Sequence, residues 1–338
     1  MILADQILAA PGSLNDRMWH GALTQAYPDM VDAAKFIMSR DMAQAMLRVA
    51  RSRPSSLLAA MSFARLPHPV TWIEWLFKDV KDAGGYTGDE HDCPITPTRV
   101  GVLLIAEDET MLCGTAFLFW DDPRPKAIVT SAAMALFDWN EDPRLVNRQD
   151  LSIKDPIDDL RATLIKADKF SHLAGFIKDD AEIEAMIEQN RRTTQRPSLL
   201  LHDYLMDLMR QGQDPKDIPL IRNASSDWSG ELGLVMAMLI MLNSKNCVAV
   251  EKIDQTRINR SRARKKKPPL ADHGVIHLKL SRAWAKRTGN GSMTREQARA
   301  HIVRGHFKVR KGGVFWWSPF MRGQGGGTPT PKTYKVTL

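Results

Sequence analysis

The chain has 338 residues, of which 43% are hydrophobic and 25% charged, and it carries a net charge of +8. This is the composition of an ordinary globular protein with a sizeable core, so two domains or one large domain with an appendage are expected. The three cysteines, Cys93, Cys113 and Cys247, are far apart and form no CxxC pair. They argue against a disulfide framework or a zinc ribbon and fit a reducing cytosol.

No membrane span or secretory signal is predicted. The most apolar run, Leu232–Leu242, has about half the length that a membrane-spanning helix needs. The N-terminus lacks the basic region that opens a signal peptide, and its apolar run is short. The expected location is therefore the cytoplasm, with no membrane partner.

The charge is divided unevenly along the chain. From Glu251 to the C-terminus there are 21 Lys and Arg against 4 Asp and Glu, a net charge of +17, whereas residues 1–250 carry 26 against 35, a net charge of −9. A basic segment on a mildly acidic body is typical of a protein that binds a polyanion. The alternative is a basic surface that only keeps the protein soluble.

The first 60 residues are expected to be helical, because apolar residues recur at helical spacing through Met30–Val49. Leu66–Phe77 begins with Pro67 and Pro69, which favour extended backbone, and continues with apolar residues that belong in a core. Glu74 lies among them and would need a partner if it is buried.

An antiparallel meander is predicted next. Its strands are the runs Val100–Ala106, Met111–Trp120 and Ala127–Leu136, which are separated by turn residues. Amphipathic helices are then predicted at Asp159–Ala167, Asp179–Gln189 and Leu199–Gln211. Leu234–Leu242 is apolar on all sides and is the expected central helix, followed by a strand at Cys247–Ile253 on the same core.

No cofactor or metal site is predicted. The loop Gly84–Pro97 contains His91, Asp92 and Cys93, but no further ligands stand nearby at the spacing that a metal site requires. The run Gly325–Gly327 lacks the Lys-Ser/Thr and the following helix of a phosphate-binding loop.

Thr256–Leu270 holds seven basic residues and no acid, so it cannot pack into a core. We interpret it as a solvated linker or as an arm that tracks phosphates. The predicted fold class is α+β: a helical body with an antiparallel sheet over residues 1–255, the basic linker 256–270, and a small basic β-rich module over residues 271–338.

The C-terminal module begins with a predicted strand at Gly274–Leu280 and a short helix that ends near Ala300. It continues with Arg299–Gly323, the densest group of functional side chains in the chain, with two histidines, six cations and two adjacent tryptophans. Lys311-Gly312-Gly313 predicts a hairpin turn, and Val314–Ser318 is the expected partner strand.

Alternation along the first strand of this hairpin separates its two faces. His301 goes with apolar residues, where a hydrogen-bonded core histidine is expected. The other face carries Arg304, His306, Lys308 and Arg310. Of the pair Trp316 and Trp317, one faces the core and the other is free to stack on a base.

A face of this composition suits RNA, because Arg and Lys bind phosphates. The predicted nucleic-acid-binding residues are Arg262, Arg264, Lys265, Lys266, Lys267, Arg299, Arg304, His306, Lys308, Arg310, Lys311, Trp316, Trp317 and Arg322. The same face suggests a second hypothesis, metal-independent cleavage of RNA, with His306 as base and with Arg304 and Lys308 as stabilising cations. Neighbouring positive charge would keep His306 neutral. The residues leave binding and cleavage open, and binding is the simpler claim.

The stretch RAHIVRGHFK…G…FWWSPFMRG resembles the C-terminal signature of a protein family that is widespread on phages and plasmids. That signature reads H-x-x-R-x-H-aromatic, then a Gly-containing turn, then aromatic-x-x-P-aromatic. His301, Arg304, His306 and Phe307 match its first part, and the second part falls on Trp316, Pro319 and Phe320. The chain departs from it at Phe307, where the family has Trp, and at Lys308, where it has His.

The family includes a type V-A anti-CRISPR protein. The resemblance implies a mobile-element protein that lowers expression of a specific target, with the N-terminal body recognising a nascent polypeptide or host protein and the basic module meeting mRNA or the ribosome. A phage structural or assembly protein, or a regulator that binds DNA, are alternatives from other classes. The sequence contains no helix-turn-helix signal that would favour the regulator.

Overall fold

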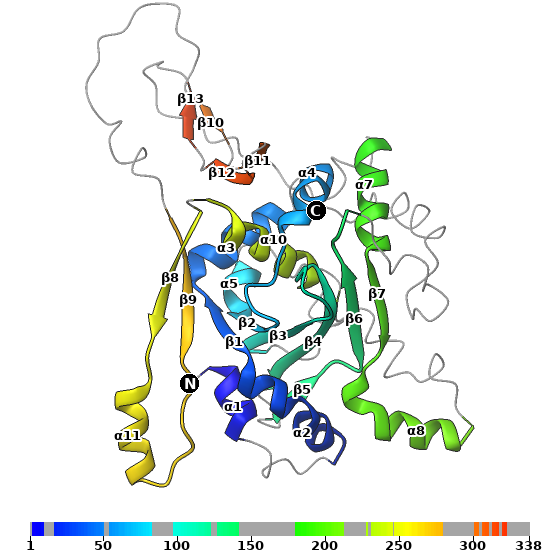
Figure 1. Cartoon of the computed structure of the whole chain (residues 1–338), viewed down its shortest axis with the longest axis vertical. Coiled ribbons are helices and arrows are strands. Elements are labelled where there is room, and N and C mark those ends of the chain that lie inside the picture. The colour runs from blue at the N-terminus through cyan, green and yellow to red at the C-terminus, as the bar shows by residue number, and fades with distance from the viewer. Residues whose placement is uncertain are drawn as a thin grey trace, which may run out of the picture.

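The computed structural model describes residues 2–9, 17–50, 54–82, 97–122, 127–141, 180–212, 228, 231–245, 247–279, 301–303, 306–310, 313–317 and 320–322. These residues form an α+β fold, as the sequence predicts, built on one nine-stranded sheet (Figure 1). The predicted helix Asp159–Ala167, the loop residues His91, Asp92 and Cys93, and the short helix ending near Ala300 lie outside the described residues.

The strands follow the order β7-β6-β4-β3-β2-β1-β9-β8, with β5 paired to β4 beside β6. Their bounds are β1 (Ala34–Met38), β2 (Val70–Leu76), β3 (Arg99–Ala106), β4 (Cys113–Asp122), β5 (Ala127–Thr130), β6 (Ala133–Asp138), β7 (Thr193–Pro197), β8 (Val248–Ile253) and β9 (His273–Leu278). All ladders are antiparallel except those that β1 forms with β2 and β9. The sheet is therefore mixed rather than purely antiparallel.

Helices cover both faces of the central strands. The helices are α1 (Leu3–Ala9), α2 (Arg17–Asp32), α3 (Arg40–Ala50), α4 (Pro54–Ala60), α5 (Phe77–Asp82), α7 (Asp180–Arg191), α8 (His202–Arg210), α10 (Glu231–Asn243) and α11 (Thr256–Arg264), with 3₁₀ turns η1 (Met61–Phe63) and η4 (Leu199–Leu201). In the view of Figure 1, α1 and α2 lie below β1–β4, and α3, α5 and α10 lie above them. Neighbouring residues of β2 are accordingly both buried: Glu74 faces α1, and Trp75 is fully buried as well.

The helix predicted across Met30–Val49 is wrong in its centre, where β1 separates α2 from α3. Phe36 of β1 pairs with Ile73 of β2 on one side and Gly274 of β9 on the other. Two ladders of backbone hydrogen bonds outweigh the local helical spacing, because intrinsic propensity is a weak preference. Phe36 does not fit the helical spacing of the apolar residues around it, and this mismatch is the sequence feature that indicates a break in the predicted helix.

The central apolar helix, the meander and the two later helices that fall on described residues agree with the structure apart from a few bounds. The apolar helix is α10, and its residues from Leu234 to Met241 are all buried. The strand predicted at Ala127–Leu136 is divided into β5 and β6, which both pair with β4. Of the segment predicted as helix over Leu199–Gln211, the first turn is the 3₁₀ turn η4 and the rest is α8. Among the described residues, no helix has the length and apolar character needed to cross a membrane.

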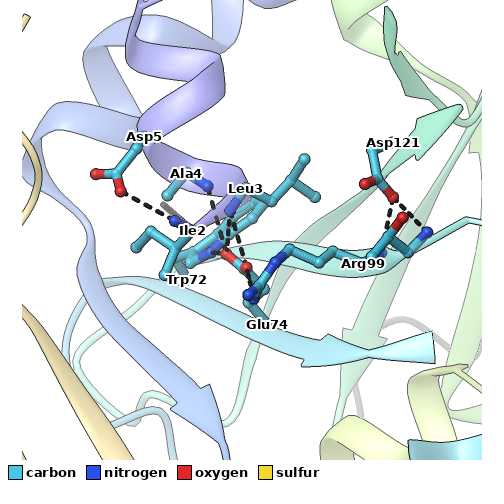
Figure 2. Close-up of polar contacts among 9 residues, drawn as sticks. Ile2, Leu3, Ala4, Asp5, Trp72, Glu74, Arg99 and Asp121 are labelled. Atoms are coloured by element: carbon cyan, nitrogen blue, oxygen red, sulfur yellow. Dashed lines mark hydrogen bonds and ion pairs between the residues drawn. The ribbon is translucent and has the colours of Figure 1, made fainter. Parts of the chain in front are cut away.

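A buried carboxylate ties the first helix to the sheet (Figure 2). The side chain of Glu74, on β2, is fully buried and accepts hydrogen bonds from the backbone N–H of Leu3 at 2.8 and 2.9 Å. It also accepts from the indole Nε1 of Trp72 at 3.1 Å and from a guanidinium nitrogen of Arg99 at 2.7 Å. The partner that the sequence demanded for Glu74 is therefore a set of donors from α1, β2 and β3.

The ribbon β8–β9 belongs to this sheet and not to a separate C-terminal module. β9, predicted as the first strand of that module, pairs with β1 along Phe36↔Gly274 to Met38↔Ile276. β8 is the edge strand, and its four central residues are exposed rather than part of the core. The structure thus extends the sheet beyond the predicted boundary at residue 271.

Candidate nucleic-acid interface

Helix α11 stands on the end of the β8–β9 ribbon and buries none of its residues. Figure 1 shows it projecting from the ribbon at the side away from α10. Even its one large apolar residue, Ile258, is 50% exposed. A helix that is polar all round gains little from packing, so its position depends on the polar contacts at its two ends and along one side.

The near side of α11 is held by the returning chain. The Asn259 amide donates to the Leu270 carbonyl at 2.8 Å and accepts from the Leu270 N–H at 2.7 Å. Arg262 Nε donates to the Pro268 carbonyl at 2.7 Å. At the base, Asp5 of α1 accepts from the Ala271 N–H at 2.7 Å. These bonds join α11 to its return segment and the return segment to the body.

The N-terminus of α11 is held by Asp254, which accepts from the Thr256 N–H at 2.7 Å. Hydrogen bonding to Thr256 lowers the pKa of the Asp254 carboxyl, and Arg260 adds to the shift. A lowered pKa in the folded state means that this contribution to stability is present above the unfolded pKa of Asp and is lost as the pH falls through the folded one.

The C-terminus of α11 closes with a Schellman motif. The Lys267 N–H donates to the Arg262 carbonyl and the Lys266 N–H to the Ala263 carbonyl, both at 3.0 Å. Lys266 has a φ of 52°, the left-handed conformation for which glycine is the usual residue. A lysine here costs about 1 kcal/mol relative to glycine. The chain therefore carries a cation at a position where the backbone conformation favours glycine.

Lys266→Gly should therefore slow hydrogen exchange of the α11 amides by up to about fivefold, which corresponds to ~1 kcal/mol of local opening free energy. Lys265→Gly is the matched control, because Lys265 has a φ of −98° and glycine there only adds freedom to the unfolded chain. Exchange that is unchanged or faster in Lys266→Gly would contradict the assignment.

The far side of α11 carries a stripe of arginines. At 3.6 residues per turn, Arg257, Arg260 and Arg264 fall within an arc of about 60°, opposite the side that Asn259 and Arg262 turn to the return segment. All three arginines are exposed, as are Lys265, Lys266 and Lys267. Among the described residues, none of these six cations forms an ion pair. We call Arg257, Arg260 and Arg264 the arginine stripe.

The predicted hairpin is present, and its strands are β11 (His306–Arg310) and β12 (Gly313–Trp317). The first strand is shorter than predicted, because β10 (His301–Val303) is separate and pairs with β13 (Phe320–Arg322). The paired residue numbers add up to the same total in both ladders. The β10–β13 ladder therefore has the same register as the hairpin ladder. Arg304, Gly305, Ser318 and Pro319 lie outside the described residues.

The register assigns the two tryptophans to faces. Residues opposite one another in an antiparallel ladder share a face, and Lys308 is opposite Phe315 while His306 is opposite Trp317. Trp317 therefore belongs with the cationic residues of β11. Trp316 shares the other face with Val314, which is buried in the core of the body.

The hairpin rests on the chain that follows α10. The Lys245 N–H donates to the Val314 carbonyl at 3.4 Å, and Lys245 Nζ lies 5.5 Å from the centre of the Phe315 ring. Lys245 also forms an isolated parallel bridge with Phe315. This contact places the hairpin at the end of the β8–β9 ribbon opposite to α11 (Figure 1).

The predicted binding residues thus fall into two groups that the structure does not bring together. Arg262, Arg264 and the three lysines after them lie on or just beyond α11, whereas His306, Lys308, Arg310, Trp316 and Trp317 lie in the hairpin and Arg322 in β13. Arg299, Arg304 and Lys311 lie outside the described residues. Arg257 and Arg260 were missed, although their spacing to Arg264 can be read from the sequence once the segment is known to be helical.

The hypothesis of RNA cleavage stays a prediction. Of its three residues, His306 and Lys308 share one face of the hairpin by register, and Arg304 lies outside the described residues. No group of three His, Cys, Asp or Glu within the described part of the chain has the geometry to hold a metal ion. Burial raises the pKa of the Cys113 and Cys247 thiols to about 12, so neither is an activated nucleophile.

Comparison with known proteins gives no further guide. No family model matches the chain, and no curated protein or solved structure matches it with significance.

Proposed function

We propose that this protein binds RNA, with α11 and the C-terminal hairpin as its contact surface. The observation that supports this best is the arginine stripe: three exposed arginines on one face of a helix of which no residue is buried. Arginine donates two parallel hydrogen bonds to a phosphate and remains charged at any physiological pH. A helix that buries no residue adds little to the stability of the fold. The conformational entropy lost in ordering α11 is therefore better explained by a ligand that it binds.

The composition of α11 defines what it contacts. From Gln255 to Asp272 the chain has no aromatic residue, so bases cannot stack on an aromatic ring there, whereas its arginines and lysines are suited to phosphates. Its ligand is therefore the phosphate backbone, and its contribution is independent of sequence and sensitive to salt. By register Trp317 falls on the cationic face of the hairpin, and we assign to it the stacking on bases.

Replacing the arginine stripe with glutamine (Arg257→Gln, Arg260→Gln and Arg264→Gln together) should weaken RNA binding about 100-fold near 0.1 M salt. The slope of log K against log salt should become shallower by about 2, since each single-strand phosphate contact contributes ~0.7. Fluorescence anisotropy with a labelled RNA over a salt series measures both quantities.

The charge-matched control removes three exposed cations elsewhere on the body, Arg40, Lys78 and Lys81, again as glutamine. Its affinity and slope should stay near those of the unchanged protein. Equal losses of affinity in both variants would mean that only the net charge of the protein matters, not the position of the cations. An unchanged affinity in the stripe variant would refute the role of α11. Competition with duplex DNA separates an RNA-binding protein from a regulator that binds DNA.

The biological role that we attach to this binding is down-regulation of a specific transcript by a protein of a mobile element, in the cytoplasm of a bacterial host. The support is the resemblance of Arg299–Gly323 to a family that contains an anti-CRISPR protein, together with the acidic body, which is suited to a polypeptide partner. Sequencing the RNA crosslinked to the tagged protein in its host, with mass spectrometry of the same sample, tests both partners. Recovery of virion proteins without specific RNA would favour a structural role in the phage.

A further inference from the structure

The two cationic elements are separated by a defined length of sheet. At one end of the ribbon the Lys279 N–H donates to the Cys247 carbonyl at 2.8 Å, two residues beyond Lys245, which contacts the hairpin. From there β8 runs six residues to Ile253, and α11 follows at Thr256. A six-residue strand spans about 20 Å, so the hairpin and the arginine stripe are at least roughly that far apart.

We propose that α11 and the hairpin bind one RNA molecule at the same time, as two contact points that the β8–β9 ribbon holds at a fixed distance. The proposal rests on the proposed function, because it presumes that the ligand is RNA. It goes further in naming the class of RNA: one long enough to reach from the hairpin to the arginine stripe.

The ribbon is built to keep the distance constant. β8 and β9 pair in unbroken register from Val248↔Leu278 to Ile253↔His273, and β9 is also paired to β1. The return segment is tied to α1 through Asp5 and Ala271. A rigid spacer raises the effective concentration of the second contact once the first has formed, and two linked contacts commonly bind 10²–10⁴-fold tighter than either alone.

The surface between the two contacts carries charges of both signs, and two-point binding does not require the RNA to touch it. The three carboxylates along the ribbon and at the base of α11 are engaged locally: Glu251 lies 3.3 Å from His277 Nε2, Asp254 accepts from the Thr256 N–H, and Asp272 accepts from the Gln255 N–H at 2.7 Å. Lys252 and Lys279 are exposed on the same ribbon.

The test compares two single-stranded RNAs of one sequence, about 6 and about 24 nucleotides long, which are below and above the reach of both contacts. With the unchanged protein, the long RNA should bind at least 100-fold tighter than the short one. A single contact site can bind the long RNA at roughly 20 different positions, so this statistical factor alone would make the long RNA bind only roughly 20-fold tighter than the short one. The stripe variant and a hairpin variant, Lys308→Gln with Arg310→Gln, should each bring the ratio down to that statistical value.

A third ligand removes the dependence on variants, which matters if the hairpin variant does not fold. Two copies of the short RNA joined by an uncharged polyethylene glycol spacer should bind nearly as tightly as the long RNA, because only the two ends need contact. A ratio near the statistical value in the unchanged protein, a high ratio that persists in the stripe variant, or a joined ligand no better than the short RNA would each overturn two-point binding while leaving RNA binding intact. Failure of the long RNA to bind even at low salt would instead refute the proposed function itself.

Discussion

Glu74→Ala is expected to lower the free energy of unfolding by about 3–5 kcal/mol, a large part of the 5–15 kcal/mol that stabilises a typical domain. The carboxylate is fully buried and accepts from the Leu3 N–H, from Trp72 Nε1 and from Arg99. Alanine leaves these donors without their acceptor, and the guanidinium of Arg99, whose side chain is only 24% exposed, without its counter-charge. Urea unfolding followed by circular dichroism measures the loss.

Hydrogen exchange locates the same effect. Glu74→Ala should increase the exchange rate of the amides in segment 2–9 more than that of the amides in α10, because the lost hydrogen bonds connect α1 to the sheet. Glu251→Ala on β8 is the control: its carboxylate is exposed and paired only with exposed His277, and such pairs contribute at most about 1 kcal/mol. A Glu74→Ala protein that unfolds within 1 kcal/mol of the control would contradict the assigned role.

The sequence was most informative where burial and chain pattern agree. The apolar run of α10, the strands β3 and β4 and the exposed character of Thr256–Leu270 could all be predicted, because each depends on a run of similar residues. Glu74 was recognised as an acid that needs a partner. Which donors satisfy it could not be predicted, since Leu3 and Arg99 lie 71 and 25 residues away from it.

The errors arise where pairing between distant segments decides the local structure. β1 is formed by partners on both sides that lie far along the chain, so the helical spacing around it was misleading. β9 was assigned to the C-terminal module for the same reason: nothing in its own residues reveals that β1 and β8 flank it. The observed pairing of β9 explains why the two cationic groups are separated. β9 leads the chain away from α11 to the end of the ribbon near Lys245, which contacts the hairpin.

Gly101→Ala is expected to destabilise the protein by about 3 kcal/mol or more, near or above the upper end of the usual cost of overpacking. A Cβ at Gly101 would lie 2.1 Å from Cζ2 of Trp72, and Trp72 is fully buried. Gly101 is also the residue opposite Glu74 in the β2–β3 ladder. A displaced indole can no longer donate to Glu74, so the added methyl group disturbs both the packing and the polar cluster.

A double-mutant cycle distinguishes this cause from a general weakness of β3. Trp72→Phe removes the ring atoms that the new Cβ would meet, so Gly101→Ala should cost much less in the Trp72→Phe background than alone, with a coupling free energy of about 1–3 kcal/mol. Additive costs would place the strain elsewhere in the strand.

Gly233→Ala makes the same chemical change with the opposite expected sign. Apart from the adjoining residues and backbone of α10 itself, no heavy atom of the described residues lies within 4 Å of a Cβ built at Gly233, and alanine in a helix is more stable than glycine by about 0.5–1 kcal/mol. If both substitutions destabilise the protein, the expected gain from alanine in α10 is refuted, and the contrast between the two glycines no longer supports the clash with Trp72. If Gly233→Ala stabilises while Gly101→Ala destabilises, the space around Trp72 sets the size of residue 101, and the glycine is required there so that the indole can reach Glu74.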